Sequence, residues 1–418
     1  MKNKPAVYAW AFYDWANSAF ATTVMAGFFP LFFKQYWAVG MDASESTFWL
    51  GMGNACAGLI IAMLAPVLGA MADQGGLKKR MLLSFTTLGV LMTAGLFLAT
   101  EGQWILALLL YAFGALAFSG ANVFYDAMIV DVSEHEHLHQ TSALGFGLGY
   151  LGGGLLFAFN VWMTQNPADF GLANTGEAVR WAFVSVALWW AIFSLPLARY
   201  VHEACDSAAP SLWQAARSGI AQLGGTFKNL RSLRHIWLFL LAYFLYIDGV
   251  NTVARMAVDY GLSLGFDSGV LIKALLMTQF IAFPAALALG WLGEHWNAKY
   301  VLLICIATYA VVCIWSSTMQ NAQDFYWLAG GIGLVMGGIQ ALSRSMYARM
   351  IPLNQAAEFF GFFNMLGKFA TVLGPALMGL VSILSGSPRF SMLAIVALFS
   401  AGGFLLYFVQ EPKAEASH

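Results

Sequence analysis

Two polar motifs with identical spacing interrupt apolar stretches of this chain. Both have the pattern Asp-x-x-Asn-[Ser/Thr]: Asp14, Asn17 and Ser18 in the first, and Asp248, Asn251 and Thr252 in the second. Residues i, i+3 and i+4 share one face of a helix, so each motif predicts a compact polar patch. A carboxylate within a membrane helix usually faces the bundle interior or a water-filled path. We therefore expect Asp14 and Asp248 to bind a cationic group of a substrate or to carry a proton.

Two arginines could complete a binding site for a zwitterion, because a guanidinium can bind a carboxylate through two hydrogen bonds. Arg255 continues the helical stripe that begins at Asp248, and Arg344 lies in a later apolar stretch. Two structural alternatives stay open. The Asn and Ser/Thr residues of the motifs can hold neighbouring helices together, and Arg255 can pair with Asp259 one turn further along.

Lys368 stands deep inside the apolar stretch 357–382. At this depth a lysine cannot easily extend its ammonium to the membrane surface. We expect it to face protein or water and to have an acidic partner, either as a structural pair or as a counter-ion in a central cavity.

The elements that must position these residues are membrane helices. Of the 418 residues, 60% are hydrophobic and only 10% are charged, whereas a soluble domain has roughly 25% charged residues. The net charge of −1, without a basic patch, argues against nucleic acid as a partner. We find no nucleophile–base set, no phosphate-binding G-x-x-x-x-G-K-[ST] loop and no convincing metal or cofactor motif. The sequence therefore predicts neither an enzyme nor an ATP-driven pump.

Twelve apolar stretches have about the 20 residues that a helix needs to cross a bilayer. Their approximate bounds are 7–33, 47–72, 80–99, 103–129, 141–163, 180–201, 235–258, 268–293, 299–319, 325–350, 357–382 and 389–410. Lys and Arg are more frequent in the connections on the side of the two termini, which predicts cytoplasmic termini in a bacterial inner membrane. The expected fold is thus an all-α membrane protein.

The chain also divides into two similar halves. We expect six-helix bundles at 1–201 and 235–418, joined by a cytoplasmic linker, 202–234, that contains an amphipathic helix. Besides the two polar motifs, charged positions recur at matching offsets in the two halves. We expect those near the cytoplasmic helix ends to form gating contacts between or within the halves: Asp73, Lys78, Lys79, Asp126, Asp131, Glu294, Arg344 and Arg349. Two six-helix repeats about a pseudo-twofold axis are typical of transporters.

Two sets of residues carry a resemblance to known proteins. GAMADQGGLKK resembles the loop signature of the major facilitator superfamily at Gly69, Asp73, Gly76, Lys78 and Lys79, with Gln74 departing from it. YDWANSAFATTV, FYDAMIVDV and GLGYLGG resemble the vacuolar amino-acid effluxer-like family within that superfamily. This resemblance implies a cavity lined by the first, fourth, seventh and tenth helices. On these helices and the eleventh we expect the cavity residues Asp14, Asn17, Ser18, Asn122, Tyr125, Asp248, Asn251, Thr252, Arg255, Gln340, Arg344 and Lys368.

The function predicted from these patterns is secondary active transport by alternating access. We expect a monomer that moves a small polar or zwitterionic metabolite, with amino acids implied by the resemblance, coupled to protons. One alternative is a cation-coupled sugar or glycoside carrier, in which Trp10, Tyr13 and Trp15 would stack on the substrate. Another is a membrane sensor that has the same fold but does not transport.

Overall fold

The computed structural model describes residues 4–73, 76–203, 212–228, 233–263, 265–371, 373–385 and 390–410, and these ranges contain helices and no strands. Eleven of the helical segments are long and apolar enough to cross a membrane, and Ser391–Tyr407 is a shorter twelfth. Each coincides with one of the twelve predicted stretches, so the expected all-α fold is confirmed. Parts of the predicted linker, 204–211 and 229–232, lie outside the described residues.

The first half contributes six spanning segments. They are α1 with its continuation (Lys4–Trp37), α3 (Ala43–Asp73), α4 (Lys78–Gly95), α5 (Trp104–Ala127), α7 (Leu138–Gln165) and α8 (Thr175–Tyr200). The first continues from α1 (Lys4–Ala19) through a π-helix (Phe20–Phe28), α2 (Phe29–Phe32) and a second π-helical turn (Phe33–Trp37). Short 3-10 turns at Leu96–Leu98, His135–His137 and Pro167–Phe170, and the single turn α6 (Ile129–Val132), complete this half.

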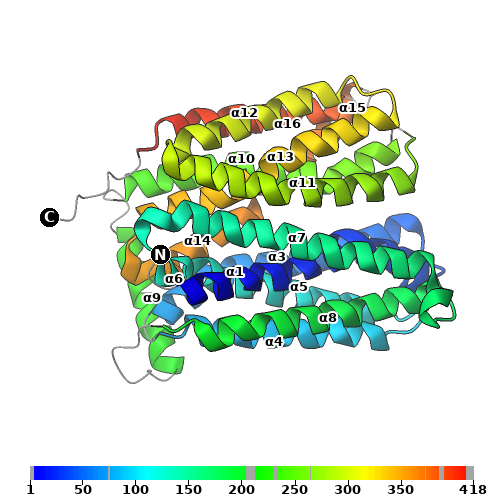
Figure 1. Cartoon of the computed structure of the whole chain (residues 1–418), viewed down its shortest axis with the longest axis horizontal. Coiled ribbons are helices and arrows are strands. Elements are labelled where there is room, and N and C mark those ends of the chain that lie inside the picture. The colour runs from blue at the N-terminus through cyan, green and yellow to red at the C-terminus, as the bar shows by residue number, and fades with distance from the viewer. Residues whose placement is uncertain are drawn as a thin grey trace.

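The second half repeats this arrangement after the linker helix α9 (Leu212–Lys228). Its segments are α10 (Arg234–Ser263), α11 (Ser268–His295), α12 (Ala298–Ser316), α13 (Ala322–Met350), α14 (Ala356–Phe369) with α15 (Leu373–Ser385), and α16 (Ser391–Tyr407), with a 3-10 turn at Leu353–Gln355. In Figure 1 this half forms the upper layer and the first half the lower layer, with α14 reaching down beside α3. We call the end of the bundle at which α1 begins and α9 lies the α9 side, and the opposite end the far side (Figure 1).

The eleventh span is broken, which the apolar run did not predict. Pro375 has no N–H to donate to the carbonyl of Thr371, and its ring would collide with that turn of a continuous helix. The chain therefore leaves the helix after Phe369 and starts α15 at Leu373, where Pro375 is accommodated in the first turn.

Contacts between the halves follow a pseudo-twofold pattern. The second span of the first half, α3, packs on the eleventh span at α14, and the fifth span, α7, packs on the eighth, α11. Each contact thus joins a second helix of one half to a fifth helix of the other. The repeat inferred from the sequence is therefore also a repeat of packing.

The two halves meet tightly on the α9 side. A Cβ at Gly69 would overlap the backbone of Ala357, and one at Gly361 would lie 2.5 Å from the carbonyl oxygen of Ala65. On the far side, α3 is exposed on several adjacent faces between Gly51 and Ile60, and a Cβ at Gly51 would have no neighbour within 4 Å. The two halves are thus in close contact at α3 and α14 on the α9 side, whereas the far-side part of α3 is exposed.

Candidate functional site

Arg344 lies at the centre of a buried charge network that joins the two halves. Its Nη1 donates to Asp126 Oδ1 at 3.0 Å and lies 3.7 Å from Asp14 Oδ2. Its Nε and Nη2 donate to the side chain and the carbonyl of Ser142, both at 2.9 Å. Arg344 comes from α13 in the second half, whereas its three partners come from the first half. Only 2% of Arg344 is exposed, so these contacts replace its hydration.

Aromatic rings cover the remaining faces of the Arg344 guanidinium. Its carbon lies 4.1 Å from the ring centre of Phe146 and 4.8 Å from that of Trp10. Trp10 in turn stacks on Tyr125, whose hydroxyl donates to Asp14 at 3.2 Å. These rings exclude water and strengthen the electrostatic interactions inside the network.

The first polar motif contributes directly to this network. Ser18 donates to Asp14 at 3.2 Å, and Asn17 donates to Asn122 on α5 at 2.7 Å. The motif packs against Gly149 of α7, where a Cβ would lie 2.6 Å from Ser18 Oγ and 3.0 Å from Asp14 Oδ1. Gly145 and Gly153 are similarly close to their neighbours, so the stripe of glycines on α7 admits α1 at short range, as its spacing predicts.

The second polar motif holds the broken eleventh span. Asp248 accepts hydrogen bonds from the backbone N–H groups of Leu373 at 3.1 Å and Gly374 at 2.8 Å, and from Thr252 at 3.2 Å. Asn251 donates to the carbonyl of Ala370 at 3.0 Å. Asp248 thus caps the first turn of α15, where a carboxylate also interacts favourably with the helix dipole.

Arg255 and Lys368 are two further cations near this break. Arg255 is exposed and within electrostatic reach of Asp248 and of Tyr111 in the other half. Lys368 is half-buried and within electrostatic reach of Arg255. Among the described side chains, neither cation has an ion pair within 4.0 Å. The side chain of Asp259, the alternative partner for Arg255, lies outside the described residues. The acidic partner expected for Lys368 is therefore not found.

Most of the predicted gating residues form contacts on the α9 side. Asp126 pairs with Arg344 across the halves. Asp131 binds Lys78 of its own half at 3.0 Å. The reason is that α5 ends at Ala127 and the separate turn α6 directs Asp131 toward α4.

Further contacts close the α9 side between the halves. Asp73 accepts from the N–H groups of Ala357 at 3.0 Å and Glu358 at 2.8 Å at the start of α14. Glu294 lies 2.7 Å from His137 and accepts from the N–H of Gln140 at 3.1 Å.

Arg349 interacts with a histidine that the sequence did not single out as a gating residue. Arg349 Nη1 lies 2.8 Å from His139 Nε2, and His139 Nδ1 lies 2.8 Å from Ser345 Oγ. Because an arginine can only donate, His139 Nε2 must be the acceptor, and the ring is neutral in this arrangement.

Other contributors to the site were also missed from the sequence. Ser142, Phe146 and Asn364 contact the Arg344 network or its acids, and Asn364 donates to Asp126 at 3.0 Å. Tyr150, which donates to Gln340 at 2.7 Å, was also not predicted as a site residue. Phe146 and Tyr150 lie within the glycine-rich part of α7, but nothing in their local spacing indicates a partner in the other half.

Glu203 gives the α9 side a pH-dependent contact. The carboxylate of Glu203 accepts from the N–H of Lys79 at 2.6 Å, and burial raises the pKa of Glu203 to about 7 from its ordinary value of 4.5. Because the pKa of Glu203 is higher in the folded state than in the unfolded state, protonation of Glu203 stabilises the folded state. This stabilisation is fully present below the ordinary pKa of 4.5 and is lost as the pH rises through about 7. We therefore expect thermal stability to fall between pH 5 and pH 8, and Glu203→Gln to flatten that part of the profile. An unchanged slope in the variant would show that Glu203 does not titrate in this range.

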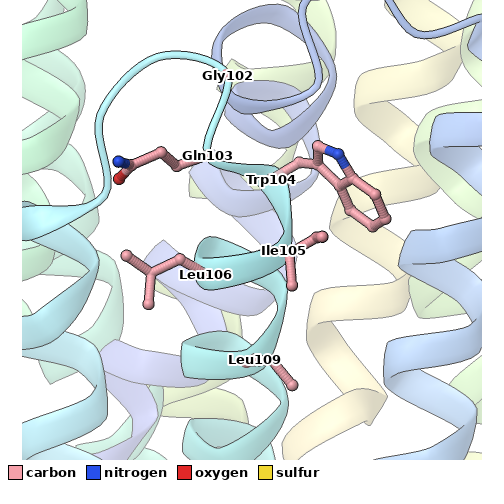
Figure 2. Close-up of a pocket in the computed structure, with 6 residues that line it drawn as sticks. All are labelled: Gly102, Gln103, Trp104, Ile105, Leu106 and Leu109. Atoms are coloured by element: carbon pink, nitrogen blue, oxygen red, sulfur yellow. The ribbon is translucent and has the colours of Figure 1, made fainter.

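The hollow at the far end of α5 is a separate feature. It is lined by Gly102, Gln103, Trp104, Ile105, Leu106 and Leu109. Figure 2 shows Gln103 and Leu106 on one side of this helix start and Trp104 and Ile105 on the other. Ile105, Leu106 and Leu109 are exposed apolar side chains, as expected for a lipid-facing surface. None of the charged residues described above lines it.

Comparisons with known proteins agree with this architecture. The family model described as "Vacuole effluxer Atg22 like" matches residues 39–141 and 129–418. The MFS-type transporter YxiO of Bacillus subtilis (strain 168) is 39% identical over 406 residues, covering 96% of this chain and 94% of that protein. Autophagy-related protein 22 of Eremothecium gossypii is 23% identical over 472 residues, covering 98% of this chain and 92% of that protein.

A solved structure shows the same fold at low sequence identity. The human organic anion transporter MFSD10 superposes with a TM-score of 0.76 at 14% identity, over 97% of this chain and 100% of that chain. The matched fold, the span of the family model and the identity to YxiO together place the sequence: this chain is an integral membrane protein of the vacuole effluxer Atg22-like family, within the major facilitator superfamily of transporters.

Proposed function

We propose that this chain is a proton-coupled secondary transporter that moves a small polar or zwitterionic metabolite, with amino acids as the first class to test. It works as a monomer in a bacterial inner membrane, with the α9 side and both termini in the cytoplasm. The observation that carries the proposal is the buried network of Asp14, Asp126 and Arg344 between the two halves.

This network can link a proton to a conformational change. It contains two carboxylates and one guanidinium, so a single added proton makes it electrically neutral. Because Arg344 belongs to the second half and both acids to the first, opening the α9 side must separate the arginine from its partners. The free energy of that separation depends on whether an acid is protonated, which couples proton binding to the opening of one side.

The alternative sugar carrier has less support from the aromatic residues. Trp10 and Tyr13 are fully buried: Trp10 stacks on Tyr125, and Tyr13 lies 2.7 Å from Thr86. Trp15 stacks on Trp189 of α8. Tyr13 and Trp15 are engaged within the first half, and Trp10 is also covered by Arg344 of the second half, whereas sugar stacking requires rings that are free to contact the ligand.

The experiment that tests the proposal is transport in proteoliposomes. Labelled amino acids are offered with and without a pH gradient, and uptake and counterflow are measured for wild type and Asp14→Asn. We expect Asp14→Asn to lose gradient-driven uptake by about tenfold or more while it retains counterflow, because exchange does not require net proton movement. Asp169→Asn, which removes an exposed carboxylate from a far-side connection, is the matched control.

Either of two results would contradict part of this proposal. Gradient-driven uptake by Asp14→Asn at the wild-type rate would exclude Asp14 as the coupling group. A wild type that moves no amino acid under any gradient would exclude the amino-acid substrates, and sugars and glycosides would be tested next.

A further inference from the structure

Two cations, Arg255 and Lys368, lie on the far side near the break of the eleventh span, and neither has an ion pair within 4.0 Å among the described side chains. Asn251 bonds to the carbonyl of Ala370, which places the end of α14, and with it Lys368, beside this part of α10. Arg255 lies one helical turn further along α10, about 6 Å away along its axis. The two cations therefore lie together near the break of the eleventh span, and the electrostatic interaction between them agrees with this placement.

The nearest described acid does not neutralise both cations. Asp248 already accepts three hydrogen bonds, two of them from the first turn of α15. Among the described side chains, one carboxylate beside two cations leaves an excess of one positive charge. Arg344, which is fully buried, differs because it is held by Asp126 and Asp14.

The first half offers neutral hydrogen-bonding groups. Tyr111 on α5 lies within electrostatic reach of Arg255 and donates to Asn54 of α3 at 2.8 Å. Asn54 is exposed on α3, whereas Tyr111 is buried and its hydroxyl is held by Asn54. Of these two neutral groups, the amide of Asn54 is the one that a ligand could contact.

We propose that Arg255 and Lys368 form the binding site for a carboxylate group of the transported metabolite. This inference rests on the proposed transport function and adds the chemical group that the protein recognises. A guanidinium can bind a carboxylate through two hydrogen bonds, and the ammonium adds a third donor. The binding of a carboxylate also removes the excess positive charge, which is costly in a partly desolvated site. An ammonium group on the ligand is not required at this site.

The test measures binding and does not depend on transport. Thermal unfolding of the purified full chain is recorded with L-leucine, succinate and lactate, each beside its amide analogue (leucinamide, succinamide and lactamide). A ligand that binds the folded state raises the unfolding temperature, so a concentration series gives an apparent affinity. We expect at least one of the acids to stabilise wild type and its amide to do so about tenfold more weakly or not at all.

Variants then locate the effect. Arg255→Gln and Lys368→Gln should each weaken binding of that acid by about tenfold or more, whereas Arg255→Lys, which keeps the charge but loses the two-pronged geometry, should lose less. Lys273→Gln is the matched control, because it removes an exposed charge near the far end of α11. If a Gln variant does not fold, the comparison of acid with amide in wild type and Arg255→Lys still decides the question.

Several outcomes would overturn the proposal. The first two are equal binding of acid and amide, and no binding of any acid. The third is a loss of binding in Lys273→Gln as large as that in the Arg255 and Lys368 variants, which would indicate only a general electrostatic effect of positive charge. The two proposals can also fail separately. Carboxylate binding without transport would refute the transport function, whereas transport of a solute without preference for the carboxylate would refute only this site.

Discussion

Replacing Arg344 with glutamine should destabilise the protein by about 3–5 kcal/mol, the range observed when one partner of a buried ion pair is removed. The substitution leaves Asp14 and Asp126 buried between the halves without a cation. It also removes the donor to Ser142 and the positive charge between the rings of Phe146 and Trp10. Thermal or denaturant unfolding of the purified protein measures the loss, and transport should disappear in the same variant.

The companion variants separate charge from packing. Adding Asp126→Asn to Arg344→Gln should restore part of the lost stability, because one of the two unpaired carboxylates is then neutral. Arg199→Gln, which alters an exposed arginine on α8, should change stability by less than about 0.5 kcal/mol. An Arg344→Gln protein as stable as wild type would mean that the network does not contribute to closing the α9 side.

The helices of this fold could be predicted because a lipid environment allows few other backbone conformations. Backbone groups in lipid must be satisfied within a helix, so each long apolar run is a span. The departures occur where one residue changes the local geometry. Pro375 follows the break in the eleventh run, but Pro66, Pro196 and Pro284 lie inside continuous helices, so proline alone did not locate the break. Likewise, no feature of Phe20–Phe28 distinguished a π-helix from a regular turn.

The site was predicted less well, because the contacts of a side chain depend on the tertiary packing around it. The two Asp-x-x-Asn-[Ser/Thr] motifs show this, since both face a glycine of the fifth helix in their own half. Asp14 lies against Gly149 and Asp248 against Gly374. The residue after Gly149 is Tyr150, and α7 continues, so Asp14 accepts from the side chains of Ser18 and Tyr125 and its Oδ2 lies 3.7 Å from Arg344. The residue after Gly374 is Pro375, and the break exposes N–H groups that occupy Asp248. The two motifs therefore have the same sequence pattern but different surroundings in the folded protein.

Replacing Gly69 with leucine should shift the protein away from the state that is closed on the α9 side. A Cβ at Gly69 would overlap the backbone of Ala357, and backbone cannot move aside as a flexible side chain can. Overpacking of this kind costs about 1–3 kcal/mol or more, which changes a two-state population roughly tenfold or more. In alternating access the far side closes when the other side opens, so the exposed far-side part of α3 should become less accessible.

Alkylation of a single cysteine on the exposed far-side part of α3 measures this shift. The reporter is Asn54→Cys in a Cys56→Ala, Cys205→Ala background, because Asn54 and Cys56 are both exposed on α3 and Cys205 lies outside the described residues. The other two cysteines, Cys305 and Cys313, are buried. We expect Gly69→Leu to slow alkylation by about tenfold. Gly361→Leu should have the same effect from the α14 side of the contact, because a Cβ at Gly361 would lie 2.5 Å from the carbonyl oxygen of Ala65. Gly379→Leu is the control, because a Cβ at Gly379 has no neighbour within 4 Å. Equal alkylation rates in all three variants would show that the contact between α3 and α14 does not determine the balance between the states closed on the α9 side and closed on the far side. The charged contacts of Arg344 and Asp73 would then have to determine it.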